Sequence, residues 1–315
     1  MKQEFIKSIG TELKGMCGGN INSELWFCGI EWGNWQLDKE HKHVKNDDDL
    51  NECQEDVYLN ECQECLFSES IILNIKDQQV NIPCIPKGGL KYNNNVTVNL
   101  SDYNFDTRIT KIVLSCMNTD WEPEIITPKS KDNREVWSKN NPNLSKYLQD
   151  KLYQNVEDGI FNLNLFPIAK RNTETWGPKH TVQTGLDKKS YYVHCKEEGR
   201  FKLFRDLVTE KQPKVIVCIG KSYREDFIDA FWGKDISSIN EKVTRKIYQE
   251  EIIQLKESSL KISIYRKENK PALVVLPFLS NYFLSKDKDL KEIGKYIRDN
   301  QKELELTKPP FCDQN

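Results

Sequence analysis

Residues 24–37 read E-L-W-F-C-G-I-E-W-G-N-W-Q-L and join a short apolar run to a Gly-x-Glu-x-Gly turn. The apolar run at 25–28 is typical of a buried β-strand. Glu31 follows that strand almost directly, between Gly29 and Gly33. Open α/β sheets hold their ligands beyond the carboxyl ends of their parallel strands, so the sequence predicts that Glu31 lies at a functional edge.

Three more apolar runs have the same character as the first. They are 158–165 (D-G-I-F-N-L-N-L), 214–219 (K-V-I-V-C-I) and 272–276 (A-L-V-V-L). The run at 214–219 is continuous in its hydrophobicity after Lys214, which is typical of a parallel strand that is buried on both faces. Helical spacing predicts helices at 2–15, 143–154, 201–211 and 286–301. The expected fold class is therefore α/β, with a central four-stranded parallel sheet flanked by helices.

A long insertion is expected inside this single domain of residues 1–315, at residues 38–125. Its first part, to about residue 60, is polar and predicts a solvated loop. β-branched residues between turn signals then predict hairpin strands. These expected strands are 71–76, 80–85, 95–100 and 111–115.

Composition limits the classes of function. The 315 residues carry 46 Lys and Arg against 48 Asp and Glu, so any nucleic-acid contact must come from local basic patches. No apolar run is as long as the roughly 18 residues of a membrane span, and the first residues lack the apolar centre of a secretory signal. We expect a cytoplasmic protein with no membrane contact.

The four strand ends resemble, in their order, the motifs of the uracil-DNA glycosylase superfamily. Residues 29–33 (G-I-E-W-G) look like its first motif, with Trp32 where relatives have proline. Residues 164–168 (N-L-F-P-I) resemble the N-L-C-P-L element of its single-strand-selective branch. Residues 215–221 (V-I-V-C-I-G-K) and 274–281 (V-V-L-P-F-L-S-N) occupy the places of the third and fourth elements.

This resemblance implies a uracil-DNA glycosylase-like fold and a monofunctional DNA glycosylase that flips a modified pyrimidine and hydrolyses its N-glycosidic bond. In that reaction Glu31 would orient water and stabilise the sugar cation, and Asn164 would read the base. Asn162 shares the face of Asn164 by strand alternation and is the competing reader. The chain looks most like bacterial anti-phage enzymes that act on glucosylated hydroxymethylcytosine in phage DNA and leave abasic sites.

Other residues of the four loops complete the predicted site. Those expected to border the base or its sugar are Gly29, Trp32, Gly33, Trp35, Asn162, Phe166, Lys170 and Arg171. Those expected to contact DNA are Lys221, Ser222, Phe278, Ser280 and Asn281. The two tryptophans could equally be core aromatics, and Lys221 with Ser222 could be an ordinary helix start.

Three alternative functions remain open. Leu276 and Pro277 stand where relatives carry a histidine that stabilises the departing base, which favours a catalytically silent DNA-binding or regulatory module. A uracil repair glycosylase with an unusual last motif is a second alternative. The cysteines Cys53, Cys62, Cys65 and Cys84 include one C-x-x-C pair and suggest a metal-dependent nuclease or nucleotide hydrolase as a third. We predict no cofactor and no obligate protein partner.

Overall fold

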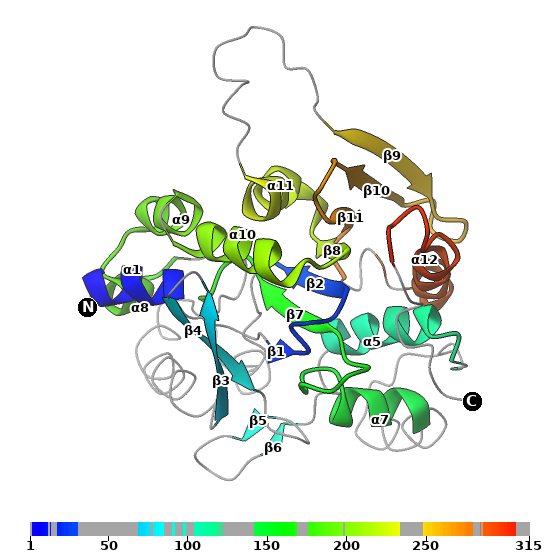
Figure 1. The fold of residues 1–315 in the computed structure, drawn as a ribbon, viewed down its shortest axis with the longest axis horizontal. Helices are drawn as coiled ribbons and strands as arrows, with labels where there is room; N and C mark the ends of the chain where they lie inside the picture. Colours follow the sequence, from blue (N-terminus) through cyan, green and yellow to red (C-terminus); the bar gives the residue numbers. More distant parts are fainter. Residues whose placement is uncertain are drawn as a thin grey trace, which may run out of the picture.

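A seven-stranded mixed sheet forms the centre of the protein in a computed structural model (Figure 1). The structure describes residues 2–11, 13, 18–30, 69–75, 78–84, 90–91, 97–98, 104–119, 121, 142–168, 176–197, 199–233, 248–279, 284 and 286–306. The strand order is β1 (Gly18–Gly19), β7 (Phe161–Asn164), β2 (Leu25–Gly29), β8 (Val215–Ile219), β11 (Ala272–Leu276), β10 (Lys261–Arg266) and β9 (Gln249–Gln254).

The strands expected from the sequence are neighbours in this sheet. β2 pairs in parallel with β7 and with β8, and β11 pairs in parallel with β8. β1, β10 and β9 join by antiparallel pairing. The α/β class is thus confirmed, whereas the expected sheet of four strands is one of seven. Sequence analysis missed β9 because its residues, Q-E-E-I-I-Q, are largely polar and exposed, as an edge strand allows.

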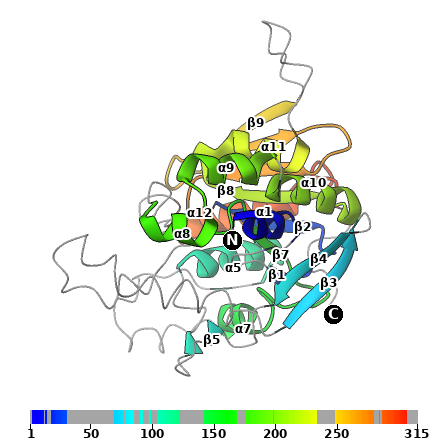
Figure 2. The same ribbon diagram turned by 90° about the vertical axis from the view of Figure 1, so that its left-hand side faces the viewer.

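Helices cover both faces of the sheet (Figures 1 and 2). On one face pack α5 (Asn104–Cys116), α7 (Pro142–Asp150) and α12 (Asp287–Asp299). On the other pack α1 (Lys2–Thr11), α9 (Lys188–Glu197), α10 (Arg200–Lys211) and α11 (Arg224–Trp232). Side chains of β8 alternate between the two apolar layers, which is why that strand is apolar at every position.

Smaller elements complete the described chain. They are α8 (Pro178–Thr184), the 3₁₀ turn η2 (Lys221–Tyr223), the antiparallel pair β3 (Glu69–Ile75) and β4 (Gln78–Cys84), and the short pair β5 (Leu90–Lys91) and β6 (Thr97–Val98). The hairpin predicted at 71–76 and 80–85 is confirmed by β3 and β4. Of the strand predicted at 95–100, only the two residues of β6 are paired.

The strand predicted at 111–115 is wrong, because these residues belong to helix α5. Ile109, Ile112, Val113 and Cys116 are buried and recur at three- and four-residue intervals, which is the period of a helix face rather than of a strand. The β-branched run K-I-V-L-S suggested a strand, but tertiary packing overrides such local preference. The stretch predicted as an insertion therefore supplies a helix to the main core.

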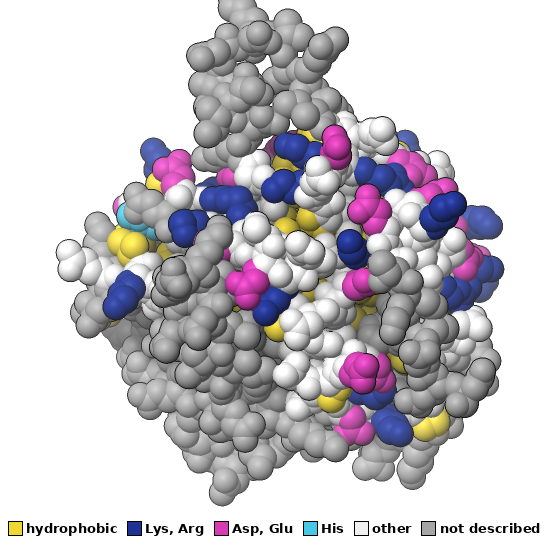
Figure 3. All heavy atoms as spheres, in the orientation of Figure 1, with side chains coloured by type: hydrophobic (Ala, Val, Ile, Leu, Met, Phe, Trp, Pro, Cys, Tyr) yellow, Lys and Arg dark blue, Asp and Glu magenta, His cyan; other side chains and the backbone are white. Residues whose placement is uncertain are grey.

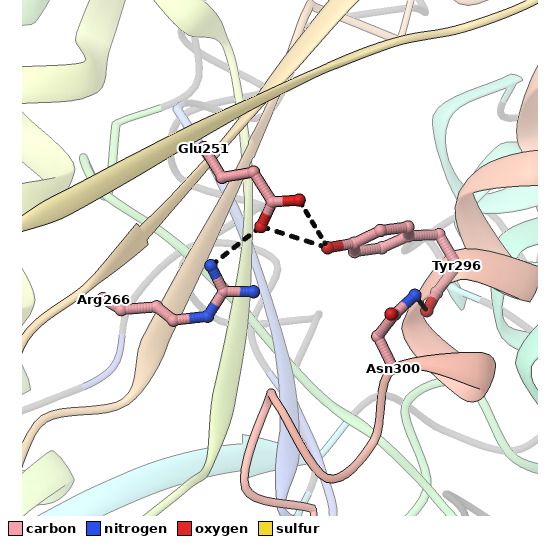
Figure 4. A network of polar contacts seen from close by, with 4 residues as sticks. All are labelled: Glu251, Arg266, Tyr296 and Asn300. Carbon is pink, nitrogen blue, oxygen red and sulfur yellow. Dashed lines mark hydrogen bonds and ion pairs between the residues drawn. The ribbon is translucent and has the colours of Figure 1, made fainter.

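A surface network fastens the outer strands to α12 (Figure 4). Arg266 of β10 donates from Nη1 to Glu251 Oε2 of β9 over 2.9 Å, and the Tyr296 hydroxyl approaches the same carboxylate at 3.4 and 3.5 Å. Asn300 Nδ2 donates to the Tyr296 carbonyl over 2.9 Å. Because these groups are exposed or half-buried, the network holds an edge in place and adds little to stability.

Within the described part of the chain, no helix combines the length and the apolar character needed to cross a membrane.

Candidate active site at the carboxyl edge of the sheet

Gly29 and Asn164 meet at the ends of two parallel strands, where the register of β2 and β7 places them opposite each other. A Cβ atom on Gly29 would stand 2.4 Å from Asn164 Oδ1 and 3.2 Å from Cζ of Phe105. The Asn164 amide and the Phe105 ring therefore fill the space that any other residue at position 29 would need. The side chain of Asn164 is buried, at 5% exposure.

Phe105, which lies near Gly29, is paired with a second phenylalanine, Phe278. Phe105 belongs to the first turn of α5, and Phe278 follows β11. Their ring centroids are 6.5 Å apart, and Phe278 is 42% exposed. Phe278 was predicted as a DNA contact, whereas Phe105 was missed because it lies in a stretch with no recognisable motif. The edge thus combines an amide with an aromatic ring that solvent can reach.

The backbone around Asn164 is held from two sides. The N–H groups of Leu165 and Phe166 donate to the carbonyls of Gly29 and Ile30, each over 2.9 Å. On the other side the fully buried guanidinium of Arg200 donates from Nε and Nη2 to the Asn164 carbonyl, each over 2.9 Å. Sequence analysis missed Arg200, since nothing in the sequence marks it as buried.

Phe166, predicted to border the base or sugar, is fully buried. Its ring meets Tyr192 edge-on at 4.6 Å, and Phe201 lies 5.9 Å away. Tyr191 and Tyr223 complete this aromatic cluster, each 6.3 Å from Phe166. The cluster belongs to the apolar layer opposite the one that α5 covers, so it supports the strand end from behind.

Asn162 and Asp106 are buried polar residues under the same face as Asn164. Asn162 Nδ2 donates to the Leu152 carbonyl over 2.6 Å, while its Oδ1 has no hydrogen-bond partner. Asp106 Oδ1 accepts from the Tyr153 hydroxyl over 2.7 Å, and its Oδ2 has no hydrogen-bond partner either. Burial raises the pKa of Asp106 to about 7, and the Tyr153 bond offsets only part of that rise. The Asp106 carboxyl is therefore partly protonated near neutral pH.

The loops after β8 and β11 adjoin this edge. Gly220 has φ +129°, and a Cβ there would stand 2.3 Å from Ile30 Cδ1, so position 220 requires glycine. Its N–H donates to the Leu276 carbonyl over 2.9 Å. Lys221 and Ser222 are exposed in η2. Leu276, which stands where the motif that the sequence resembles has a histidine, is fully buried in the core.

Several predicted site residues lie outside the described residues. These are Glu31, Trp32, Gly33, Trp35, Lys170, Arg171, Ser280 and Asn281, and of the cysteines Cys53, Cys62 and Cys65. Cys84 is the last residue of β4. Among the residues that the structure describes, no group of three or more His, Cys, Asp or Glu side chains could hold a metal ion.

Cys28, Cys116, Cys195 and Cys218 are buried and are not joined in disulfides. Comparison with known proteins adds no relative, since no protein-family model matches the chain and no curated protein sequence matches it.

Proposed function

We propose that this protein is a DNA glycosylase that hydrolyses the N-glycosidic bond of a modified pyrimidine flipped out of DNA. The best candidate base is glucosylated hydroxymethylcytosine in phage DNA, and the product is an abasic site. The enzyme would act in bacterial anti-phage defence in the cytoplasm. The base and the biological role rest on the motif resemblance of the four strand ends.

One observation carries the proposal, namely that the Asn164 amide and the Phe105 ring both lie against Gly29, with the half-exposed Phe278 ring paired to Phe105. An amide offers both a donor and an acceptor, which matches the edge of a pyrimidine. An aromatic ring offers a face on which a flat base can stack. This combination supports recognition of a single extruded base.

The chemistry assigned to Glu31 follows from its sequence position, two residues beyond Gly29. As the N-glycosidic bond breaks, its electron pair leaves with the base and the sugar becomes cationic. A carboxylate at this place would stabilise the cation and accept a proton from the water that attacks it. Because no motif position offers an obvious lysine nucleophile for Schiff-base chemistry, the reaction would be monofunctional hydrolysis.

A catalytically silent DNA-binding module is the second candidate, and the buried Leu276 favours it. Members of the superfamily that the motifs resemble stabilise the departing base with a histidine at this place, whereas Leu276 is 0% exposed and belongs to the core. Such a module would retain base recognition at Asn164 without bond cleavage.

The test compares wild type, Glu31→Ala and Asn164→Ala on three DNAs, containing glucosylated hydroxymethylcytosine, uracil or unmodified bases. Released base and abasic sites are measured. We expect release from the glucosylated DNA alone, and its loss in both variants. Asn22→Ala is the matched control, because Asn22 is exposed in the turn before β2, at the opposite end of that strand.

Each other outcome selects a rival. Release from uracil DNA would make the protein a uracil repair glycosylase. No release, combined with tight binding that Asn164→Ala weakens, would identify the silent module.

A further inference from the structure

We propose that Arg200 is a positioning residue, which sets the place of the base-reading amide by holding the backbone of Asn164. This inference rests on the proposed function, because it gives Arg200 a task in base recognition. Its geometry is independent of that function. Two donors of a single guanidinium, Nε and Nη2, reach the same carbonyl oxygen, each over 2.9 Å.

Burying Arg200 costs free energy, because its guanidinium loses its hydration. Arg200 is 0% exposed, and a buried cation is tolerated only where hydrogen bonds replace its hydration. Its guanidinium also lies 5.1 Å from the centre of the Phe204 ring, one turn further along α10. A strand end that only needed covering could have an apolar side chain there at lower cost.

The guanidinium shape explains why the bond can position the strand end. A planar guanidinium whose Nε and Nη2 both donate to one carbonyl oxygen restrains the distance and the direction of that carbonyl, whereas a lysine ammonium is a point charge on a flexible stem. Lysine at this place would keep the charge and lose the restraint. Charge and position can therefore be separated by one substitution.

The first turn of α10 holds the whole segment, not only one carbonyl. Arg200 bonds Asn164, and the ring of the next residue, Phe201, packs 5.9 Å from that of Phe166. From the opposite side, the carbonyls of Gly29 and Ile30 accept from Leu165 and Phe166. With the backbone fixed on both sides, the Asn164 amide can rest only where Gly29 leaves room for it. A small misplacement of a binding group can cost roughly 100-fold in rate.

The experiment measures base release by Arg200→Lys per folded molecule, with Arg205→Lys as the matched control. Arg205 lies on the same helix and donates from Nη1 to a backbone carbonyl as well, that of Asp229 over 3.0 Å. We expect Arg200→Lys to lower kcat by about 10- to 100-fold with KM for DNA unchanged. We expect Arg205→Lys to leave both constants unchanged.

A double-mutant cycle separates positioning from folding. If Arg200 acts through Asn164, then Arg200→Lys lowers the residual rate of Asn164→Ala no further. Independent, multiplying losses would overturn the proposal. A normal kcat for the folded Arg200→Lys enzyme would also overturn it, whatever the change in melting temperature.

A measurement on the free protein keeps this inference apart from the proposed function. In NMR spectra we expect the side-chain amide signals of Asn164 to shift or broaden in Arg200→Lys and to stay in place in Arg205→Lys. If the Asn164 amide signals are unchanged in Arg200→Lys, the positioning role is overturned even when the wild-type enzyme is active. If the signals shift but the wild-type protein releases no base, only the glycosylase function is overturned. Arg200→Gln, which keeps an N–H donor group without charge, is the second variant. Failure of both variants to fold would make Arg200 a requirement of the fold and overturn a separate positioning role.

Discussion

Gly29 has no room for a side chain, and this makes it a sensitive probe of the site. The methyl group of Gly29→Ala would stand 2.4 Å from Asn164 Oδ1. Contacts this short force one atom to move, and the amide is at the end of a side chain while its strand is held by the sheet. We expect base release to fall at least about 10-fold, because the amide loses its place. Activity on the glucosylated DNA is the measurement.

Gly177→Ala is the control for this substitution. A Cβ there would meet only Nδ1 of His180, at 3.8 Å, which is an ordinary contact. Its activity should equal that of wild type. Equal activity of Gly29→Ala would mean that the Asn164 amide does not act where the structure holds it.

Asp106 makes stability depend on pH. Its pKa is raised from 3.8 to about 7 in the folded protein, so folding disfavours the charged form. Below about pH 4 the Asp106 carboxyl is protonated in both the folded and the unfolded protein, so its burial does not reduce stability. The free energy of unfolding then falls as the pH rises from about 4 to 7, and Asp106 lowers it no further above pH 7. Asp106→Asn removes this loss and keeps an acceptor for Tyr153. We expect the free energy of unfolding of Asp106→Asn to exceed that of wild type by an amount that grows through this pH window to about 4 kcal/mol. Urea unfolding at each pH measures it.

Asp187→Asn gives a contrast of opposite sign. Bonds from the N–H and hydroxyl of Ser190 lower the pKa of the exposed Asp187 carboxyl. Its contribution is present above the unfolded pKa and disappears as pH falls through the lowered one. If the difference in free energy of unfolding between Asp106→Asn and wild type stayed constant from pH 4 to 7, the raised pKa of Asp106 would be contradicted.

Helices α5 and α12 pack with almost no space between them at Gly294. A Cβ at this position would stand 2.4 Å from both the Ile112 carbonyl and Ser115 Cβ. Gly294→Ala must push the helices apart or strain them, so we expect the free energy of unfolding to fall by about 1–3 kcal/mol. Lys295→Ala, at the exposed neighbouring position, should change it by less than about 0.5 kcal/mol. Denaturant unfolding checks both, and a neutral Gly294→Ala would show that the two helices yield freely.

The whole molecule carries little net charge, so DNA binding must depend on a few local contacts. Basic and acidic side chains are interspersed over the face seen in Figure 3, and the formal net charge is −2. Lys221 is exposed at the start of η2, directly after the Gly220 turn at the proposed DNA-binding edge. We expect Lys221→Ala to weaken binding to all DNA sequences alike and to reduce the salt dependence of log K by about one unit of slope.

The control for Lys221 is Lys270→Ala. Lys270 lies in the turn before β11, at the amino ends of the parallel strands and so at the opposite end of the sheet from Lys221. Binding isotherms over a range of salt concentrations measure both variants. An unchanged slope in Lys221→Ala would place the DNA elsewhere.

How much could be read from the sequence depended on how local the signal was. The strands β2, β8 and β11 could be predicted from their apolar runs, and β7 from its alternation of apolar residues with buried asparagines, because strands inside a sheet covered on both faces are rich in apolar side chains. The polar residues that end them, including Asn164, could be assigned to one edge because parallel strands bring their carboxyl ends together. The identity of α5 could not be read, since the β-branched residues of 111–115 suit a strand as well as a buried helix.

The sequence by itself determined the α/β class, the core strands and the position of Asn164 at a strand end. Only the tertiary structure decided that Phe105 lies against Gly29, that Asp106 is buried with a raised pKa, and that Arg200 holds the Asn164 carbonyl. The physical reason is distance along the chain. Period and propensity act among near neighbours, whereas burial, hydrogen bonding and pKa depend on partners that only folding brings into contact.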